Sequence, residues 1–82
     1  MIKVLFFGQL REQVGMNAKE ISAKGISTLA DVKLAISSLD SNFAPLFQDG
    51  KLLMAINQEM SVQSQQVNDG DEVAFFPPVT GG

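Results

Sequence analysis

The stretch TLADVKLAISSLD, residues 28–40, decides the fold because it predicts one amphipathic helix. Thr28 is placed to cap this helix, and Asp31 follows three residues later, where a carboxylate favours a helix N-terminus. The pair is close to a capping box, with Asp in place of the usual Glu or Gln. Spacings of three, four and three residues form one apolar stripe, made of Leu29, Val32, Ile36 and Leu39. That stripe must pack against a sheet, and the flanking segments supply the strands.

Two strands are expected before this helix. IKVLFFG, residues 2–8, is rich in β-branched and aromatic residues and ends on a glycine, which is typical of a strand. NAKEIS, residues 17–22, predicts a second, shorter strand that pairs with the first as a hairpin. The intervening QLREQVG, residues 9–15, is expected to be a short connection with a helical turn.

The segments after the helix complete the sheet. FAPLFQDG, residues 43–50, predicts a short helical or irregular piece that ends in a turn at its last two residues, Asp49 and Gly50. KLLMAIN, residues 51–57, is almost wholly apolar, as expected for a strand covered on both faces. A short edge strand is expected over 60–62, and a turn at 69–70. EVAFF, residues 72–76, predicts the last strand, and the prolines end it because proline cannot donate to a sheet ladder.

The order of these elements is strand, strand, helix, strand, short pieces, strand. One helix must then cover one mixed sheet, and the last strand returns beside the first. This is the α+β, ubiquitin-like β-grasp arrangement, and the preference for right-handed crossovers favours it over its mirror image. We expect residues 1–76 to form the β-grasp domain and residues 77–82 to form an extended C-terminal tail.

Composition excludes several classes of function. The 82 residues include no Cys and no His, so thiolate metal sites, a cysteine nucleophile and the usual general base are missing. The net charge is −3 and the six basic residues are scattered, which argues against nucleic-acid binding and anionic membranes. The opening MIKVLFFG, residues 1–8, does not match a signal peptide, so we expect a cytoplasmic protein. Asp69 and Asp71 flank a glycine and are interpreted as turn formers, with no metal site expected.

The chain ends on FFPPVTGG, residues 75–82, which allows two interpretations. In the first, the prolines merely end a strand and the glycines are a flexible end. In the second, the carboxylate of Gly82 is the working group: the prolines project the tail, and glycines without Cβ atoms can enter a narrow channel in another protein. A carboxylate is a poor electrophile and must first be activated. The chain has no Gly-rich phosphate loop, so a separate enzyme would have to supply that step.

Three segments together resemble the small subunits of molybdopterin synthases, a family of ubiquitin-like sulfur carriers. They are MIKVLFFGQLRE at 1–12, DGKLLMAINQ at 49–58 and NDGDEVAFFPPVTGG at 68–82. The resemblance spans the chain, is weakest through the helix and residues 61–66, and is most specific in the FPPV stem followed by Gly-Gly.

The resemblance implies a role in molybdenum cofactor biosynthesis. A ubiquitin-activating-type enzyme would adenylate Gly82 with ATP, and a sulfur donor would convert the acyl-adenylate to a thiocarboxylate. The tail would then enter the large synthase subunit and donate its sulfur to precursor Z (cyclic pyranopterin monophosphate), forming the molybdopterin dithiolene. The inserted residues would be Pro77, Pro78, Val79, Thr80 and Gly81. The family also suggests two carriers on a dimeric large subunit, a heterotetramer in which the carrier binds no cofactor stably and supplies no catalytic side chain.

Two alternatives stay open. The chain could be a sulfur carrier for another pathway, such as thiazole synthesis or thiolation. It could also be a ubiquitin-like modifier or interaction module whose tail does no chemistry. The partner that co-purifies, and the effect of deleting Gly82, would separate these readings.

Strand alternation nominates a docking surface for the partners. If Lys3 and Glu72 face water, then Phe7 and Phe76 lie on the outer face of neighbouring strands, while Phe6 and Phe75 enter the core. Met60, isolated among polar residues, is a candidate third member, since methionine suits a surface that packs against more than one partner. The competing interpretation is that all three are ordinary core or singly exposed residues.

Overall fold

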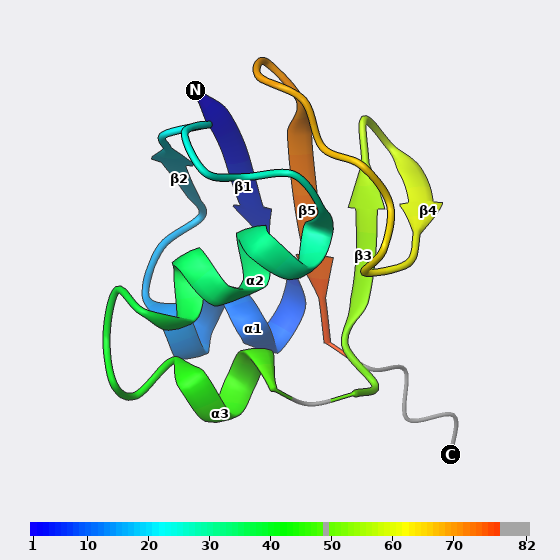
Figure 1. Cartoon of the computed structure of the whole chain (residues 1–82). Helices are drawn as coiled ribbons and strands as arrows, with labels where there is room; N and C mark the ends of the chain where they lie inside the picture. Colours follow the sequence, from blue (N-terminus) through cyan, green and yellow to red (C-terminus); the bar gives the residue numbers. More distant parts are fainter. Residues whose placement is uncertain (49, 78–82) are drawn as a thin grey trace.

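The structure, a computed structural model, describes residues 1–48 and 50–77. The expected turn at Asp49 and the tail residues 78–82 therefore lie outside the described residues. The described residues form five strands and three helices (Figure 1). They are β1 (Ile2–Phe6), α1 (Gly8–Val14), β2 (Ala18–Ile21), α2 (Leu29–Ser37), α3 (Ala44–Phe47), β3 (Leu53–Ile56), β4 (Glu59–Ser61) and β5 (Glu72–Phe76).

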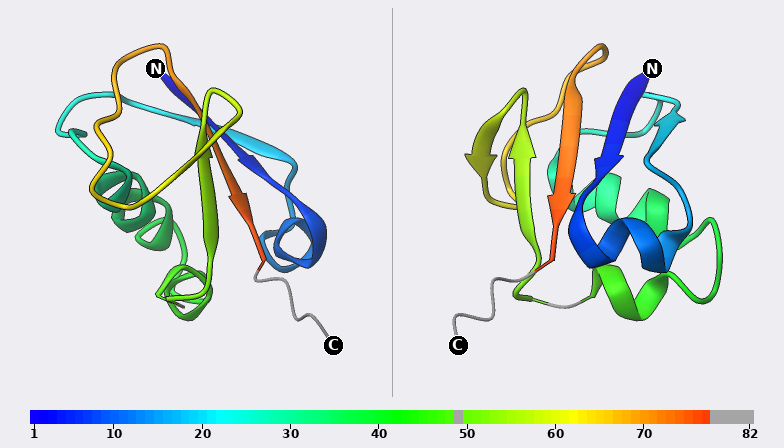
Figure 2. Two further views of the ribbon diagram at one scale, coloured as in Figure 1. Left: turned by 90° about the vertical axis from the view of Figure 1, so that its right-hand side faces the viewer. Right: turned by 180° about the vertical axis from the view of Figure 1, so that it is seen from behind.

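The strands form one mixed sheet in the order β2-β1-β5-β3-β4. β5 lies at its centre, parallel to β1 and antiparallel to β3, so the last strand returns beside the first as predicted. β2 pairs with β1 as an antiparallel hairpin, which is also confirmed. Helix α2 lies across one face of the sheet, and the view from behind shows the strands in front of it (Figure 2). The α+β prediction of one main helix on a mixed sheet is confirmed.

The core lies between α2 and the inner face of the sheet. Alternate residues of β1 and β5 are buried there, and the helix contributes Leu29, Val32 and Ile36 from its apolar stripe. Phe47 of α3 meets Phe6 and Phe75 edge-on, with ring centroids 6.0 and 5.2 Å away. Edge-to-face rings satisfy the aromatic quadrupole while filling volume, so this cluster fixes how α3 sits on the sheet.

The N-terminus of α2 is capped much as the sequence indicates. The Asp31 carboxylate accepts hydrogen bonds from the backbone N–H groups of Ser27 and Thr28, at 2.8 and 3.0 Å. These hydrogen bonds, of which the one from Ser27 has the larger effect, hold the pKa of Asp31 below the ordinary value for an aspartate. The carbonyls of Gln65 and Gln63 accept from the N–H groups of Leu29 and Ala30, so the segment after β4 also completes the cap.

Three boundary predictions were wrong. The stripe does not include Leu39, which is 49% exposed, because α2 ends at Ser37. Residues 9–15 do contain the expected helical turn, but it is part of a seven-residue helix, α1 (Gly8–Val14), with Gly15 as its C-cap; Leu10 and Val14 hold this helix to the core. The edge strand is Glu59–Ser61, one residue earlier than expected, since Asn57 and Gln58 both adopt positive φ and make a two-residue turn.

Candidate functional site

Two Phe-Phe sequences, Phe6-Phe7 and Phe75-Phe76, each place one ring in the core and the next ring on the outer face of the sheet. Phe6 and Phe75 are register partners of β1 and β5, and both are buried. The next residues, Phe7 and Phe76, point the other way, as the alternation predicted, and Phe7 is 39% exposed. Their rings stack with centroids 4.9 Å apart and planes 10° apart. The N–H of Phe7 also donates to the carbonyl of Phe75 at 3.1 Å, which fixes the pair beyond the end of β1.

These two rings belong to a larger apolar surface. They line a hollow of about 300 Å³ together with Gly8 and three further residues, Leu53, Met60 and Pro77. We call Phe7, Leu53, Met60, Phe76 and Pro77 the apolar patch. Met60 is 64% exposed and reaches the patch because it pairs with Ala55 across β3 and β4. Phe7, Met60 and Phe76 are therefore brought together, and their role as partner-binding residues stays a prediction.

Sequence reasoning missed Leu53 as a member of the patch. KLLMAIN was expected to be covered on both faces, but Leu53 is 37% exposed. The cause is register: Leu53 pairs with Phe76 at the end of β5, so its side chain joins the outer face next to the phenylalanine stack. A single apolar run does not predict that Leu53 is exposed, because the run does not indicate where the neighbouring strand ends.

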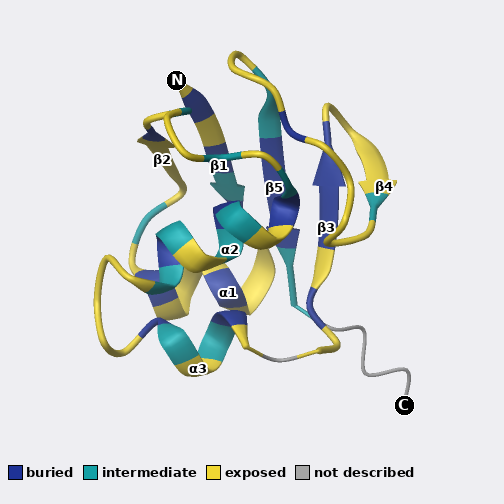
Figure 3. Ribbon diagram, in the orientation of Figure 1, coloured by how far each residue is buried: buried dark blue, intermediate teal, exposed yellow. Residues whose placement is uncertain are grey.

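A charged row limits the patch along the sheet. Lys3 of β1 lies between Glu20 of β2 and Glu72 of β5 in the two registers. Leu5, the next residue of β1 on the outer face, pairs with Ala18 and Ala74. The outer face is therefore apolar from Leu5 onward. Apolar surface bounded by polar residues is typical of interaction sites. Figure 3 shows how exposure changes along each strand.

The patch surrounds the point at which the chain leaves the sheet. Pro77 follows β5, is half-buried and lines the same hollow as Phe76. An ideal Cβ built on Gly8 would lie 3.0 Å from Cγ of Pro77, so position 8 is in close contact with the start of the tail. The predicted tail residues Pro78, Val79, Thr80, Gly81 and Gly82 lie outside the described residues, and their roles stay predictions.

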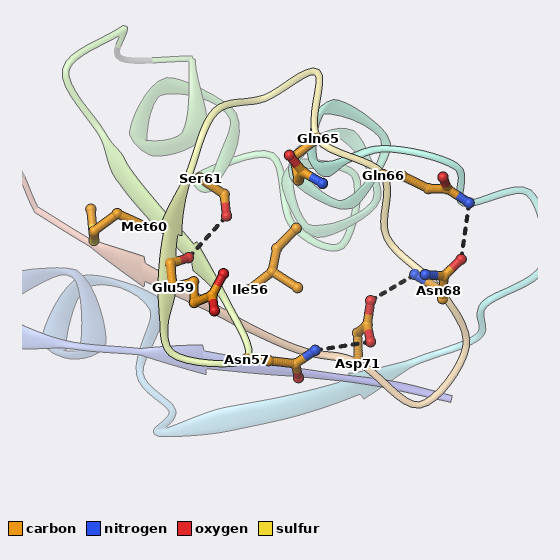
Figure 4. A pocket seen from close by; sticks show the side chains of 9 residues that line it. All are labelled: Ile56, Asn57, Glu59, Met60, Ser61, Gln65, Gln66, Asn68 and Asp71. Atoms are coloured by element: carbon orange, nitrogen blue, oxygen red, sulfur yellow. Dashed lines mark hydrogen bonds between the residues drawn. The ribbon is translucent and has the colours of Figure 1, made fainter.

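A second, polar hollow of about 370 Å³ lies beside β3 and β4, and Met60 lines it as well (Figure 4). Its side chains largely bond to one another. Asp71 accepts from Nδ2 of Asn57 at 3.1 Å and from the backbone N–H of Asn68 at 2.8 Å, while Gln66 donates to Asn68 at 3.0 Å. Asp71 therefore stabilises the turn, as expected. We interpret this hollow as a structural network that positions β5.

Asp69 also has a structural partner. Its carboxylate pairs with the N-terminal ammonium of Met1, and this hydrogen bond and the positive charge hold the pKa of Asp69 below the ordinary value for an aspartate. In residues 1–48 and 50–77, no three acidic, His or Cys residues gather as a metal site would require. Over the same residues, no helix has the length and apolar character needed to span a membrane.

Comparison with known proteins identifies relatives over the whole chain. The model of the ThiS family matches residues 4–82. The molybdopterin synthase sulfur carrier subunit of Escherichia coli K12 is 48% identical over 82 residues, which is 100% of both chains. The resemblance drawn from the sequence is therefore confirmed.

Solved structures confirm the fold. SAMP1 from Haloferax volcanii matches with a TM-score of 0.83 at 25% identity, covering 99% of this chain and 98% of that one. A complex of subunits 1 and 2 of molybdopterin-converting factor from Helicobacter pylori 26695 contains a chain that matches with a TM-score of 0.63 at 24% identity. That match covers 99% of this chain and 97% of the other.

Proposed function

The chain belongs to the ThiS family, and from that premise we propose that it is the sulfur carrier subunit of a molybdopterin synthase. Its task is to deliver sulfur for molybdenum cofactor biosynthesis in the cytoplasm. The observation that carries the proposal is the position of the apolar patch. A partner that docks on Phe7 and Phe76 lies directly beside Pro77, where the tail leaves the domain.

The proposed chemistry takes place at the carboxyl group of Gly82. An activating enzyme joins this carboxylate to AMP from ATP and releases pyrophosphate. A sulfur donor then displaces AMP and leaves a thiocarboxylate. With no Cys and no His, the carrier contributes no acid–base side chain of the usual kind, so its partners must supply these groups.

The charged carrier then docks on the large synthase subunit. Gly81 and Gly82 lack side chains, so they suit a narrow channel, while Pro77 and Pro78 have fixed φ and limit the directions that the tail can take. In the channel, the thiocarboxylate sulfur is the nucleophile toward cyclic pyranopterin monophosphate. The patch supplies the apolar contact area that holds the two proteins together during transfer.

Intact-protein mass spectrometry tests this proposal. The untagged chain is incubated with an activating enzyme, ATP and a sulfur source, and a gain equal to replacing one oxygen with sulfur is expected in the peptide that ends at Gly82. A chain without Gly82 should fold normally and gain nothing. Gly50→Ala is the matched control for a glycine change, because φ is not positive there and an added Cβ meets no neighbour. No gain with an enzyme shown to be active on another carrier would refute the function.

The choice of acceptor separates the alternatives. Sulfur transfer to cyclic pyranopterin monophosphate in the presence of the large subunit supports the proposed pathway. Transfer only to a thiazole precursor or to RNA would assign the carrier to another pathway. Stable attachment to other proteins would assign it as a modifier.

A further inference from the structure

A second apolar hollow continues from the patch around the edge of the sheet. Leu53 and Met60 line both surfaces, so the two are continuous. The hollow has a volume of about 340 Å³ and extends from β4 to helix α2. Its further lining includes Leu52, Met54, Val62 and Lys33. We call it the edge groove.

Three apolar residues that line the groove, Leu53, Met60 and Val62, are exposed, while Leu52 and Met54 are buried. Val62 follows β4 and is 65% exposed, and it lies two residues from Met60, which is also mostly exposed. Single exposed apolar residues are ordinary, but a contiguous set that joins a docking surface marks an extension of that surface.

Lys33 places a positive charge in the lining of the groove. Its side chain is half-buried, and no hydrogen-bond or ion-pair partner is found for it in the described part of the chain. The acidic residue nearest in sequence is Asp31, and its carboxylate accepts the hydrogen bonds that cap the N-terminus of α2. A cation on apolar surface favours a carboxylate supplied from outside, because desolvation on docking strengthens the attraction.

The neighbouring strand favours an extended occupant. β4 is the last strand of the sheet and pairs only with β3 among the described strands, so its other edge offers backbone groups to a docking segment. Extended segments bind such edges and place alternate side chains on the adjoining surface.

We propose that the edge groove binds an extended segment of the large synthase subunit that carries an apolar side chain next to a carboxylate. The apolar side chain lies between Val62 and Leu53, and the carboxylate pairs with Lys33. This inference rests on the proposed function. A solved complex of subunits 1 and 2 of molybdopterin-converting factor contains a chain similar to this one, and stable complexes bury more surface than transient ones do. The groove therefore enlarges the footprint on the large subunit.

Charge variants at Lys33 test the pairing through the Kd for the large subunit. Lys33→Glu should raise Kd by about tenfold, and Lys33→Gln should raise it less and flatten its dependence on salt. Lys24→Glu is the matched control: it makes the same charge change at an exposed position outside the groove and should leave Kd within about twofold. Circular dichroism checks that all three variants fold.

Val62 tests the apolar half of the site. Val62→Asp should raise Kd more than Val62→Ala, because it adds an anion where the partner's carboxylate must lie. The Kd for the activating enzyme is measured in parallel and should change less in every groove variant.

Unchanged Kd values for the large subunit, or a larger effect on the activating enzyme, would overturn the assignment. Failure of the unaltered chain to bind the large subunit at all would instead refute the proposed function.

Discussion

Replacing Phe75 and Phe76 one at a time separates what stabilises this protein from what it presents to partners. Phe75 is fully buried and contacts Phe47 edge-on and Phe6 in a stacked arrangement. Removing such a ring costs about 3–5 kcal/mol in lost burial and cavity formation. An 82-residue domain has a free energy of unfolding of roughly 4–12 kcal/mol at 0.05–0.15 kcal/mol per residue. Phe75→Ala should therefore remove a large share of it.

Phe76 differs because its ring is only half-buried and stacks on Phe7 at the surface. Its replacement by Ala should cost about 1–2 kcal/mol, from the lost aromatic pair and a part of the burial. Its effect on docking should be larger, since aromatic residues at the centre of an interface commonly contribute about 2 kcal/mol or more. That corresponds to a rise in Kd of roughly thirtyfold.

Urea unfolding followed by circular dichroism measures the first quantity, and calorimetric titration with the large subunit measures the second. Phe6→Ala and Phe7→Ala repeat the comparison on the neighbouring strand. Phe6→Ala should lower the free energy of unfolding more, and Phe7→Ala should raise the Kd more. If Phe76→Ala destabilised the protein as much as Phe75→Ala, the ring would be part of the core. If Phe76→Ala bound with unchanged Kd, the patch would not be the docking surface.

Three further predictions concern the fold. Asp31→Asn should lower the Tm at neutral pH, and the difference in Tm from the unaltered protein should shrink on acidification. The folded state lowers the pKa of Asp31, so the ionised carboxylate stabilises the protein at pH values above the pKa of the unfolded state. That stabilisation is lost as the pH falls through the pKa of the folded state. Ile36→Ala should cost about 2–5 kcal/mol in urea unfolding, while Leu39→Ala should cost less than about 1 kcal/mol; equal costs would restore Leu39 to the apolar stripe. Gly70→Ala should cost about 1–2 kcal/mol because φ is +94° there, whereas Gly50→Ala, which meets no neighbour, should be nearly neutral; the reverse order would contradict the turn geometry.

The sequence predicted features that depend on local periodicity. Alternation in the two Phe-Phe pairs was sufficient to assign Phe6 and Phe75 to the core and to place Phe7 and Phe76 outside. The position of Met60 and Leu53 could not be derived in the same way. It depends on a turn at Asn57 and Gln58, two residues without the glycine that usually signals positive φ, and on the register that this turn sets between β3 and β4.

Helix α1 shows a second limit of sequence reasoning. Its seven residues are too few for an isolated helix to be stable, so local propensity gives a weak signal. Its stability comes from burying Leu10 and Val14 against the core, which is a tertiary effect. Leu39 was also misassigned from local pattern alone, because the apolar periodicity continues past Ser37, where α2 ends.

The position in the sheet of β5, the strand that precedes the tail, bears on how the carrier can work. β5 is the central strand and is hydrogen-bonded on both sides, to β1 and to β3. A tail attached to an edge strand could be displaced by local opening of a single ladder, whereas displacing β5 requires breaking two. The stacked Phe7 and Phe76 add a further fixed point immediately before Pro77. In the proposed docking on the patch, a bound partner would therefore hold the start of the tail in a fixed position, because the strand before it resists fraying.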